Sequence, residues 1–503
     1  MAELFTRFLI LSNLHFVTLG LLSLVLPYVI FSAIYNIYFH PLSKFPGPKL
    51  AAANGLTYWA VSWSGNLVYW LRDLHAKYGE VVRYGPNKLS YISPGAWKDI
   101  YGHRIGGRKA NPKDTRFYPA ELNGHRSLVN EKDDMQHGRI RRIFAYAFSD
   151  RALKEQESLI KRYADQLMDN IHRFIEEDAN IELDLLKLYN CTTFDIMGDL
   201  AFGEPLGLLE HSEYSPWVQG IFGGIKAGDM LRITVEYPIL GKIAEHFVPR
   251  QLKAKQKEHF QFSTDRVNRR LEKGSNKPDF WTLILRQPEG SRLSIEDMHA
   301  NSSLFMIGGT ETTATLLSGL TFYLLQNADK LQKLVEEVRT SFTSEDQLTI
   351  ENLQKLKYMW ACFEEALRMY PPAPSGLPRE VAEGGNVICG RWVPETASVS
   401  VTQYAAFRSP LNFKDPDSFI PERWFPDTGF DDDRKEVFQP FSFGPRNCLG
   451  KKSLAYHEMR LLFSKTLWHF DLELCPQSES WTNQKAYTIW EKHPLMVKFK
   501  PAR

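Results

Sequence analysis

The sequence predicts a mainly α-helical fold with small β-sheets, and three observations indicate it. Between about residues 130 and 370, apolar residues recur at spacings of three and four, the period of a helix that buries one face. Short segments rich in β-branched and aromatic residues, bounded by glycine and proline, occupy 80–92, 375–405 and the C-terminal end. The 503 residues contain no Gly/Ser-rich linker and no internal repeat, so we expect one large unit.

The first element that the sequence predicts is an apolar N-terminal helix. No lysine, arginine, aspartate or glutamate occurs from Phe8 to Ser43. Residues 14–35 are apolar enough to cross a bilayer, which takes ~20 residues, and they lack the small-residue cleavage site of a signal peptide. We therefore expect residues 1–40 to form an uncleaved, single-pass membrane anchor. The lysines that follow it favour a cytosolic body, at a membrane that we expect to be the endoplasmic reticulum.

A proline-rich hinge is expected next, over residues 41–50. Its three prolines fix φ and remove backbone donors, which predicts a stiff, extended connector. Residues 51–503 form the expected body of the protein, where residues 409–440 look irregular and rich in proline. Within it we expect long helices over 153–176, 256–273, 295–326 and 331–343, and C-terminal strands over 471–474, 487–490 and 495–499.

Charge and cysteine usage exclude several classes of protein. A formal net charge of +2 argues against a protein that binds nucleic acid. The five cysteines are scattered and odd in number, without a CxxC pair, so they do not form a disulfide framework. Such usage fits a reducing compartment. A hydrophobic content of 43% is enough for a substantial core.

One of these cysteines, Cys448, lies in a glycine-bracketed loop just before a helical pattern. Gly444 and Gly450 have no Cβ, so their backbone can approach a flat cofactor closely. The N-terminus of the following helix would favour a thiolate on the sulfur. Arg446 could pair with an anionic group of the cofactor. Taken alone, such a cysteine is more often a buried residue in a turn, but this arrangement suits a thiolate held on a metal.

A second cluster lies inside the expected helix over 295–326. Gly308 and Gly309 weaken a helix interior, by roughly 1 kcal/mol each relative to alanine. The threonine hydroxyls beside them can bond the carbonyl four residues back and bend the helix. A local opening would leave room for a small ligand, beside which Glu311 and Thr312 could relay protons. Taken alone, a bent packing helix is the simpler interpretation.

Together these segments resemble the cytochrome P-450 superfamily. Its haem-ligand pattern, Phe-x-x-Gly-x-Arg-x-Cys-x-Gly, is matched at Phe441, Gly444, Arg446, Cys448 and Gly450. The Gly-Gly-Thr-Glu-Thr segment that ends at Thr312 resembles the family's oxygen-activating motif. The resemblance runs from the N-terminal anchor to about residue 500, and residues 38–42 look like those of filamentous-fungal members.

The resemblance implies a haem b site held by the five signature residues, with Cys448 as the axial ligand of the iron. Arg379, His137 and Arg141 would hold the haem propionates. The family more often has tryptophan where this chain has His137, although histidine can still donate a hydrogen bond. The simpler interpretation of any single arginine is a surface charge.

A third motif implies a structural role. Glu365 and Arg368 have the i, i+3 spacing that places both charges on one face of a helix. Locally such a pair is usually solvated and stabilises little. Here it resembles the family's Glu-x-x-Arg motif, which Arg423 would complete. The resemblance implies that these three residues lock the loop that carries the cysteine.

The fold and activity implied by the resemblance are those of a P-450 haem-thiolate monooxygenase behind one transmembrane helix. Such an enzyme inserts one oxygen atom of O2 into a small molecule. The chain has no flavin or nicotinamide fingerprint, so electrons from NADPH would come through a separate NADPH–cytochrome reductase, with cytochrome b5 as a second candidate donor. Membrane lipid is expected as a further contact of the anchor, and nucleic acid is not.

The substrate class is predicted only broadly. Contacts are expected from the segments 103–130, 205–250, 301–309, 373–378 and 484–490. Several of these segments carry Phe, Ile, Leu and Pro, which favours an apolar, medium-sized substrate of secondary metabolism. A terpenoid, a polyketide and an alkaloid intermediate remain open.

Two other functions remain as alternatives at this point. One is a haem-thiolate isomerase or dehydratase that rearranges a peroxide without O2. The other is a non-catalytic sensor that binds haem. The adjacent Glu311 and Thr312 argue against both, because neither function needs a proton relay to bound O2.

Overall fold

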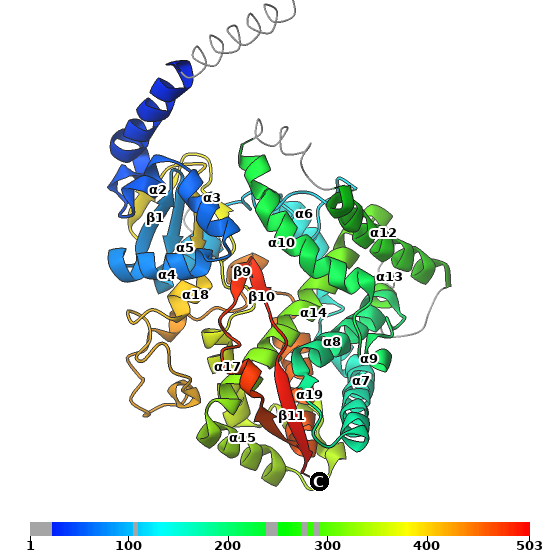
Figure 1. Cartoon of the computed structure of the whole chain (residues 1–503). Coiled ribbons are helices and arrows are strands. Elements are labelled where there is room, and N and C mark those ends of the chain that lie inside the picture. The colour runs from blue at the N-terminus through cyan, green and yellow to red at the C-terminus, as the bar shows by residue number, and fades with distance from the viewer. Residues whose placement is uncertain are drawn as a thin grey trace, which may run out of the picture.

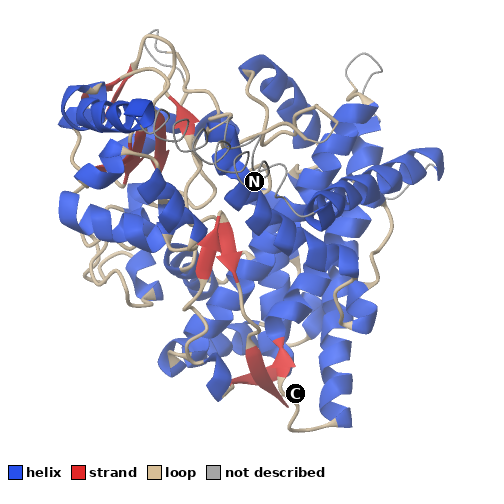
Figure 2. Cartoon of the chain, turned by 45° about the horizontal axis from the view of Figure 1, so that its top comes forward, coloured by secondary structure: helices blue, strands red, loops and turns tan. Residues whose placement is uncertain are grey.

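The computed structural model describes residues 23–103, 109–121, 123–237, 250–273, 279–285 and 292–502. Helices make up most of the molecule, and the strands form a few small sheets (Figure 1, Figure 2). The prediction of a mainly helical fold with small sheets is therefore confirmed.

A four-stranded sheet lies in the N-terminal part of the fold, close to α4 (Leu67–Tyr78) (Figure 1). Its strand order is β1-β2-β7-β4. The first two strands form the antiparallel hairpin expected over 80–92, and the other two come from the stretch 375–405. The strands are β1 (Val81–Gly85), β2 (Lys88–Tyr91), β4 (Arg379–Glu380) and β7 (Ser398–Val401), and the helices around them are α2 (Lys49–Ala53), α3 (Leu56–Trp63), α5 (Pro94–Tyr101) and α18 (Gln403–Phe407).

All four predicted long helices are present, with ends shifted by a few residues. Polar side chains cap several of them: the Ser149 hydroxyl accepts from the N–H of Ala152, and the Ser294 hydroxyl accepts from that of Asp297. The main helices are α6 (Asp134–Ala145), α7 (Asp150–Glu177), α8 (Leu185–Phe202), α10 (Pro216–Glu236), α12 (Arg250–Lys273), α14 (Ile295–Leu325), α15 (Ala328–Ser341), α17 (Lys357–Met369) and α19 (Tyr456–His469). Shorter ones are α9 (Leu208–His211), α13 (Phe280–Leu285) and α16 (Ile350–Leu353).

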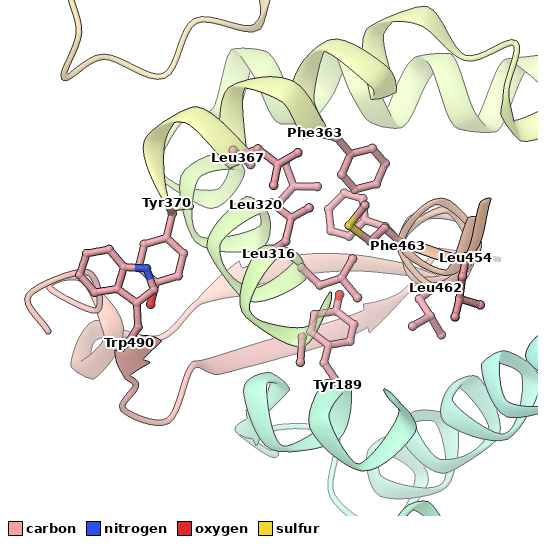
Figure 3. Packing of buried hydrophobic residues seen from close by; sticks show 14 of the residues in the cluster. Tyr189, Leu316, Leu320, Phe363, Leu367, Tyr370, Leu454, Leu462, Phe463 and Trp490 are labelled. Atoms are coloured by element: carbon pink, nitrogen blue, oxygen red, sulfur yellow. The ribbon is translucent and has the colours of Figure 1, made fainter. Parts of the chain in front are cut away.

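Helix α14 runs through the middle of the molecule and contacts α8, α12, α15, α17 and α19 (Figure 1). Leu316 and Leu320 of α14 are fully buried and lie between Tyr189 of α8 and the rings of Phe363 on α17 and Phe463 on α19 (Figure 3). Dense packing of this kind resists displacement, because any shift would open a void. The C-terminal half of α14 therefore fixes the position of the glycine- and threonine-rich segment that precedes it.

The C-terminal strands differ from the prediction in one place. The expected strand over 487–490 is two strands, because Thr488 has a φ of 67° and turns the chain between them. Contacts far along the sequence hold this turn, including a 3.0 Å bond from Arg232 Nη1 to the Thr488 hydroxyl. The strands are β8 (Phe470–Leu474), β9 (Lys485–Tyr487), β10 (Ile489–Glu491) and β11 (Met496–Pro501), with β3 (Leu183–Asp184) beside β11 and a separate hairpin of β5 (Asn386–Ile388) and β6 (Arg391–Val393).

The N-terminal segment is only partly described. Residues 23–34 are helical, while residues 14–22 of the predicted membrane span lie outside the described residues. Within the described part of the chain, no helix is both long and apolar enough to cross a membrane. The predicted extended hinge is wrong in part: Pro41–Lys44 form a 3₁₀ turn, because the His40 ring accepts a bond from the N–H of Leu42.

Candidate active site

The loop that carries Cys448 is a closed turn between residues 441 and 450. The N–H of Cys448 donates to the Phe441 carbonyl over 2.9 Å. Gly444 has a φ of 76°, and a Cβ at this position would lie 2.0 Å from the carbonyl oxygen of Tyr101. Only glycine fits this close approach. At Gly444 the loop therefore packs against the end of α5, whereas the prediction for the two glycines was a close approach to a flat cofactor.

The Cys448 side chain is exposed, although protein surrounds its sulfur. Burial is the largest influence on the pKa of the thiol and raises it, while the N–H groups of Gly450 and Lys451 and the charge of Arg141 lower it. The predicted contribution of the following backbone N–H groups is present, and it favours a thiolate.

Helix α14 presents one accessible face despite its central position. Open space lies beside Gly308, where an added Cβ would meet no atom within 4 Å. One turn later, the exposed hydroxyl of Thr312 donates to the Gly308 carbonyl over 2.8 Å. Other threonines of the segment also bond the carbonyl four residues back, as predicted. The helix nevertheless continues without a break, so the predicted local opening does not interrupt it.

The Glu311 side chain does not lie on the accessible face of α14. Its carboxylate is buried and forms an ion pair with Lys492, which follows β10. Successive helical residues lie about 100° apart around the axis, and the described contacts include no bond between Glu311 and the Thr312 hydroxyl. The structure therefore places the two predicted relay residues next to each other in sequence but on different faces of α14.

A cluster of buried cations lies near the cysteine loop. Lys113 and Arg379 are each 4% exposed and meet in an isolated antiparallel bridge. Among the described residues, no carboxylate forms an ion pair with either of them, and the Nε of Arg379 lacks a hydrogen-bond partner. Burial, followed by the charges of Arg379 and Arg446, holds the pKa of Lys113 well below its usual value. Buried charge without a counter-charge is costly, so this cluster is suited to bind an anion.

His137 belongs to the same cluster. Burial first, and then the charges of Arg446, Arg141, Lys113 and Arg379, lower its pKa to about 3. The ring is therefore neutral at physiological pH and can donate one hydrogen bond.

The third predicted propionate residue, Arg141, is bonded to protein, and so is Arg446, which was predicted to pair with an anionic group of the cofactor. Arg141 donates from both terminal nitrogens to the carbonyl and side-chain oxygens of Asn447, each over 2.6 Å. Arg446 pairs with Asp134 at 2.8 Å and donates to the Lys132 carbonyl over 3.0 Å. Both arginines thus tie the cysteine loop to α6 and to the residues before it.

Comparison with known proteins agrees with this geometry. The family model for "Cytochrome P450" matches residues 45–499. Over 471 residues, the chain is 53% identical to the cytochrome P450 monooxygenase FUM2 of Gibberella moniliformis. These residues cover 93% of this chain and 100% of that protein. This chain belongs to the cytochrome P450 family. It is also 48% identical to the P450 monooxygenase efuB of Hormonema carpetanum, over 98% of each chain. The P450 monooxygenase AMT3 of Alternaria alternata is 46% identical, over 92% of this chain and 95% of that protein.

A cytochrome P450 carries haem bound through a cysteine thiolate and uses O2 with electrons from NADPH. The site described above fits that cofactor. The accessible sulfur of Cys448 can meet the iron, the open face of α14 at Gly308 leaves space, and the unpaired cations Lys113 and Arg379 suit the propionates. The predicted family, haem cofactor and monooxygenase class are confirmed, and they leave the isomerase and sensor alternatives without support.

The triad of this P450 is assembled as the sequence motif implied. The Glu365 carboxylate accepts from Arg368 Nη2 over 2.7 Å and from Arg423 Nε over 3.0 Å. All three side chains are fully buried. Arg423 also pairs with Asp433 at 2.6 Å, which extends the network into the stretch before the cysteine loop. The role of the triad in haem retention stays a prediction.

Sequence reasoning missed two residues of the P450 site, Lys113 and Lys492. Lys113 lies in a segment without a recognisable motif, and its contact with Arg379 joins distant parts of the chain. Lys492 follows a C-terminal strand and meets Glu311 181 positions away. The only local signal was each lysine's position within or beside a segment expected to contact the substrate.

Four of the five predicted substrate segments meet at one cavity of about 50 Å³; the exception is 301–309. The walls of this cavity combine aromatic rings with charged groups. Each charge is paired, so the wall carries no net charge. The pairs are Lys88 with Glu236 at 3.1 Å, Arg116 with Asp114 at 2.8 Å, and Arg232 with Asp229.

Another buried carboxyl, that of Glu458 on α19, makes the stability of the protein depend on pH. Burial raises its pKa from 4.5 to about 8, and the nearest hydroxyl, that of Thr313, is 3.5 Å from Oε2. The folded protein keeps this proton while the unfolded chain releases it above pH 4.5. The free energy of unfolding therefore falls as pH rises from 4.5 to about 8, by about 1.4 kcal/mol per pH unit from this residue.

Glu458→Gln should remove that contribution. We expect the variant to lose less stability than the parent when pH is raised from about 5 to about 8. Denaturant unfolding of both proteins across this range measures the difference between the two slopes. Parallel profiles would show that Glu458 is ionised in the folded protein at neutral pH.

Proposed function

We propose that this P450 oxidises an uncharged, largely apolar intermediate of fungal secondary metabolism, with protons delivered along α14 by Glu311 and Thr312. The observation that carries the proposal is the exposed Thr312 hydroxyl beside the open space at Gly308, on the central helix of a P450 whose cysteine is also accessible. The relatives are fungal P450 monooxygenases, which supports the same class of chemistry.

Bound to Cys448, haem supplies the oxygen chemistry, because a thiolate ligand favours cleavage of the O–O bond. The protein supplies the rest. Gly444 lets the cysteine loop pack closely against Tyr101. Lys113 and Arg379 would neutralise the propionates, and the neutral His137 would donate a hydrogen bond to them. The side chain of Thr312 holds a hydroxyl proton on the accessible face of α14, where general acid catalysis by a side chain can act.

Thr312→Ala tests the proposed relay. With reductase, NADPH and O2, we expect a several-fold rise in the hydrogen peroxide released per NADPH consumed, because protons no longer reach bound oxygen efficiently. Thr310→Ala is the matched control: its hydroxyl bonds Met306 on the same helix but is fully buried. Equal peroxide release by both variants would remove Thr312 from the relay.

The proposed substrate class rests on the predicted substrate segments, four of which meet where aromatic rings such as Phe117 lie among ion pairs that cancel each other. These surroundings favour a neutral, largely apolar substrate near those segments, although the cavity of about 50 Å³ between them includes no residue of α14 or of the cysteine loop. A comparison of metabolites from cells that make the protein or its Cys448→Ser variant tests this. Accumulation of a charged precursor in the cells that make Cys448→Ser would contradict the proposal.

We also propose that the N-terminal segment anchors the enzyme in the endoplasmic reticulum membrane, with the body in the cytosol. Large apolar side chains on the helical residues 23–34 are exposed, among them Leu24 at 73%, Tyr28 at 71% and Phe31 at 71%. Exposed apolar surface of this extent is typical of contact with lipid. Recovery of the full chain in the carbonate-soluble fraction would contradict the anchor.

A further inference from the structure

A buried ion pair joins the oxygen-side helix α14 to the C-terminal strands. The ammonium group of Lys492 contacts the Glu311 carboxylate, and the two side chains are only 4% and 3% exposed. The same nitrogen donates to the Thr315 hydroxyl over 2.7 Å, one turn further along α14. Because solvent scarcely reaches the pair, salt and water screen it weakly.

The charge of Glu311 depends on this one lysine. The other titratable groups that face it are the hydroxyls of Tyr214 and Tyr370, both of which burial keeps neutral. Burial raises the pKa of Glu311, and Lys492 is the main influence that lowers it. Glu458 shows the result when a buried carboxyl has no cation beside it, since its pKa rises to about 8.

Lys492 reaches Glu311 from a fixed turn at the surface. The next residue, His493, is exposed, and its carbonyl accepts from the Trp481 indole over 2.8 Å. Beyond it, the N–H of Leu495 donates to Asp184 over 3.1 Å. The lysine side chain therefore spans the distance between a solvent-exposed turn and the buried acid.

We propose that Lys492 is a positioning residue for the oxygen reaction: it holds the Glu311 carboxylate ionised and anchored, so that Glu311 can accept protons from the surface turn and pass them towards Thr312. Without Lys492, the buried carboxyl stays protonated and free to turn, and the relay stalls. This inference rests on the relay role proposed above for Glu311. No residue of the cysteine loop takes part in it.

The test uses the haem-loaded enzyme with reductase, NADPH and O2, and needs no substrate. Two electrons and two protons convert O2 into hydrogen peroxide, whereas four electrons and four protons convert it into two molecules of water. The hydrogen peroxide formed per NADPH consumed therefore reports how well protons are delivered. It is measured across pH for Lys492→Met, Lys492→Arg, Glu311→Gln and the variant that combines Lys492→Met with Glu311→Gln.

We expect Lys492→Met and Glu311→Gln each to raise this ratio several-fold, and the combined variant to raise it no further. Lys492→Arg keeps the positive charge and should restore the ratio of the parent. Lys465→Met is the matched control, because Lys465 is an equally buried lysine paired with Asp165 and Glu345 far from Glu311 in the chain. It should leave the ratio and its pH profile unchanged.

Infrared spectroscopy gives a readout that does not depend on turnover. The parent should already show the carbonyl band of protonated Glu458 at neutral pH. Lys492→Met should add a second band of a protonated carboxyl, and Glu311→Gln in the same protein should remove the added band. This band assigns the change to Glu311 whatever the effect of the substitution on stability.

The results for these variants distinguish the proposed role of Lys492 from the relay role of Glu311. If Glu311→Gln leaves peroxide release unchanged, the relay role of Glu311 fails. If Glu311→Gln raises it but Lys492→Met does not, or adds no carboxyl band, the relay stands and the role of Lys492 is overturned. Equal effects of Lys492→Met and Lys465→Met would also overturn it, since any buried lysine would then serve.

Discussion

Cys448→Ser should abolish the thiolate-type Soret absorption of the reduced, carbon-monoxide-bound protein. The reason is chemical: a serine hydroxyl at this position is neither a thiolate nor readily ionised, so it cannot give iron the same ligand field. The backbone of the loop should be retained, because the bond from the N–H of residue 448 to the Phe441 carbonyl does not involve the side chain. Monooxygenase activity should fall to background in the same variant.

Cys389→Ser is the matched control for that experiment. Cys389 is the other exposed cysteine within the described part of the chain, and its sulfur forms a hydrogen bond with the Ser93 hydroxyl at 3.2 Å. This variant should keep the full thiolate-type absorption. If Cys448→Ser kept this absorption, another residue would hold the iron. The assignment of the haem site to the space between the Cys448 loop and Gly308 would then be wrong.

The parts of the site that could be predicted are those encoded by short spacings. The cysteine loop needs glycine where the backbone touches Tyr101, so Gly444 is visible in the sequence as a fixed offset from Cys448. Glu365 and Arg368 share a helix face because they are three residues apart. The central helix was predictable because apolar residues recur in it at spacings of three and four.

The parts that could not be predicted depend on contacts between distant segments. Glu311 is next to Thr312 in the sequence, but the ion pair with Lys492 holds the Glu311 carboxylate on another face of α14. The turn at Thr488 likewise depends on Arg232 and Asp229 of α10, which outweigh the strand propensity of the residues around it. No local pattern reports such partners.

Glu365→Gln should cause the largest loss of stability of any single change discussed for this protein. One carboxylate there accepts five hydrogen bonds: two from Arg368, one from Arg423, one from the N–H of Ile420 and one from the Trp424 indole. Burial alone would raise the pKa of Glu365, but the two arginines hold it below its usual value. The group is therefore fully ionised at neutral pH.

Glutamine in its place removes the negative charge and turns one acceptor into a donor that faces a guanidinium group. Two fully buried arginines then lack their shared counter-charge, and breaking a buried pair in this way costs about 3–5 kcal/mol. That is a large part of a typical free energy of unfolding, which is about 5–15 kcal/mol. We expect a much lower denaturant midpoint and poor haem retention, because Ile420 and Asp433 would no longer fix the stretch before the cysteine loop.

Glu155→Gln provides the comparison for this measurement. Glu155 also pairs with an arginine, Arg151, but the arginine side chain is 89% exposed and the pair lies on the surface of α7. Such pairs contribute about 0–1 kcal/mol, so the midpoint should scarcely move. If Glu365→Gln were no more destabilising than Glu155→Gln, the triad would not hold the loop. The position of Cys448 would then have to depend on other contacts, such as those of Arg141 and Arg446.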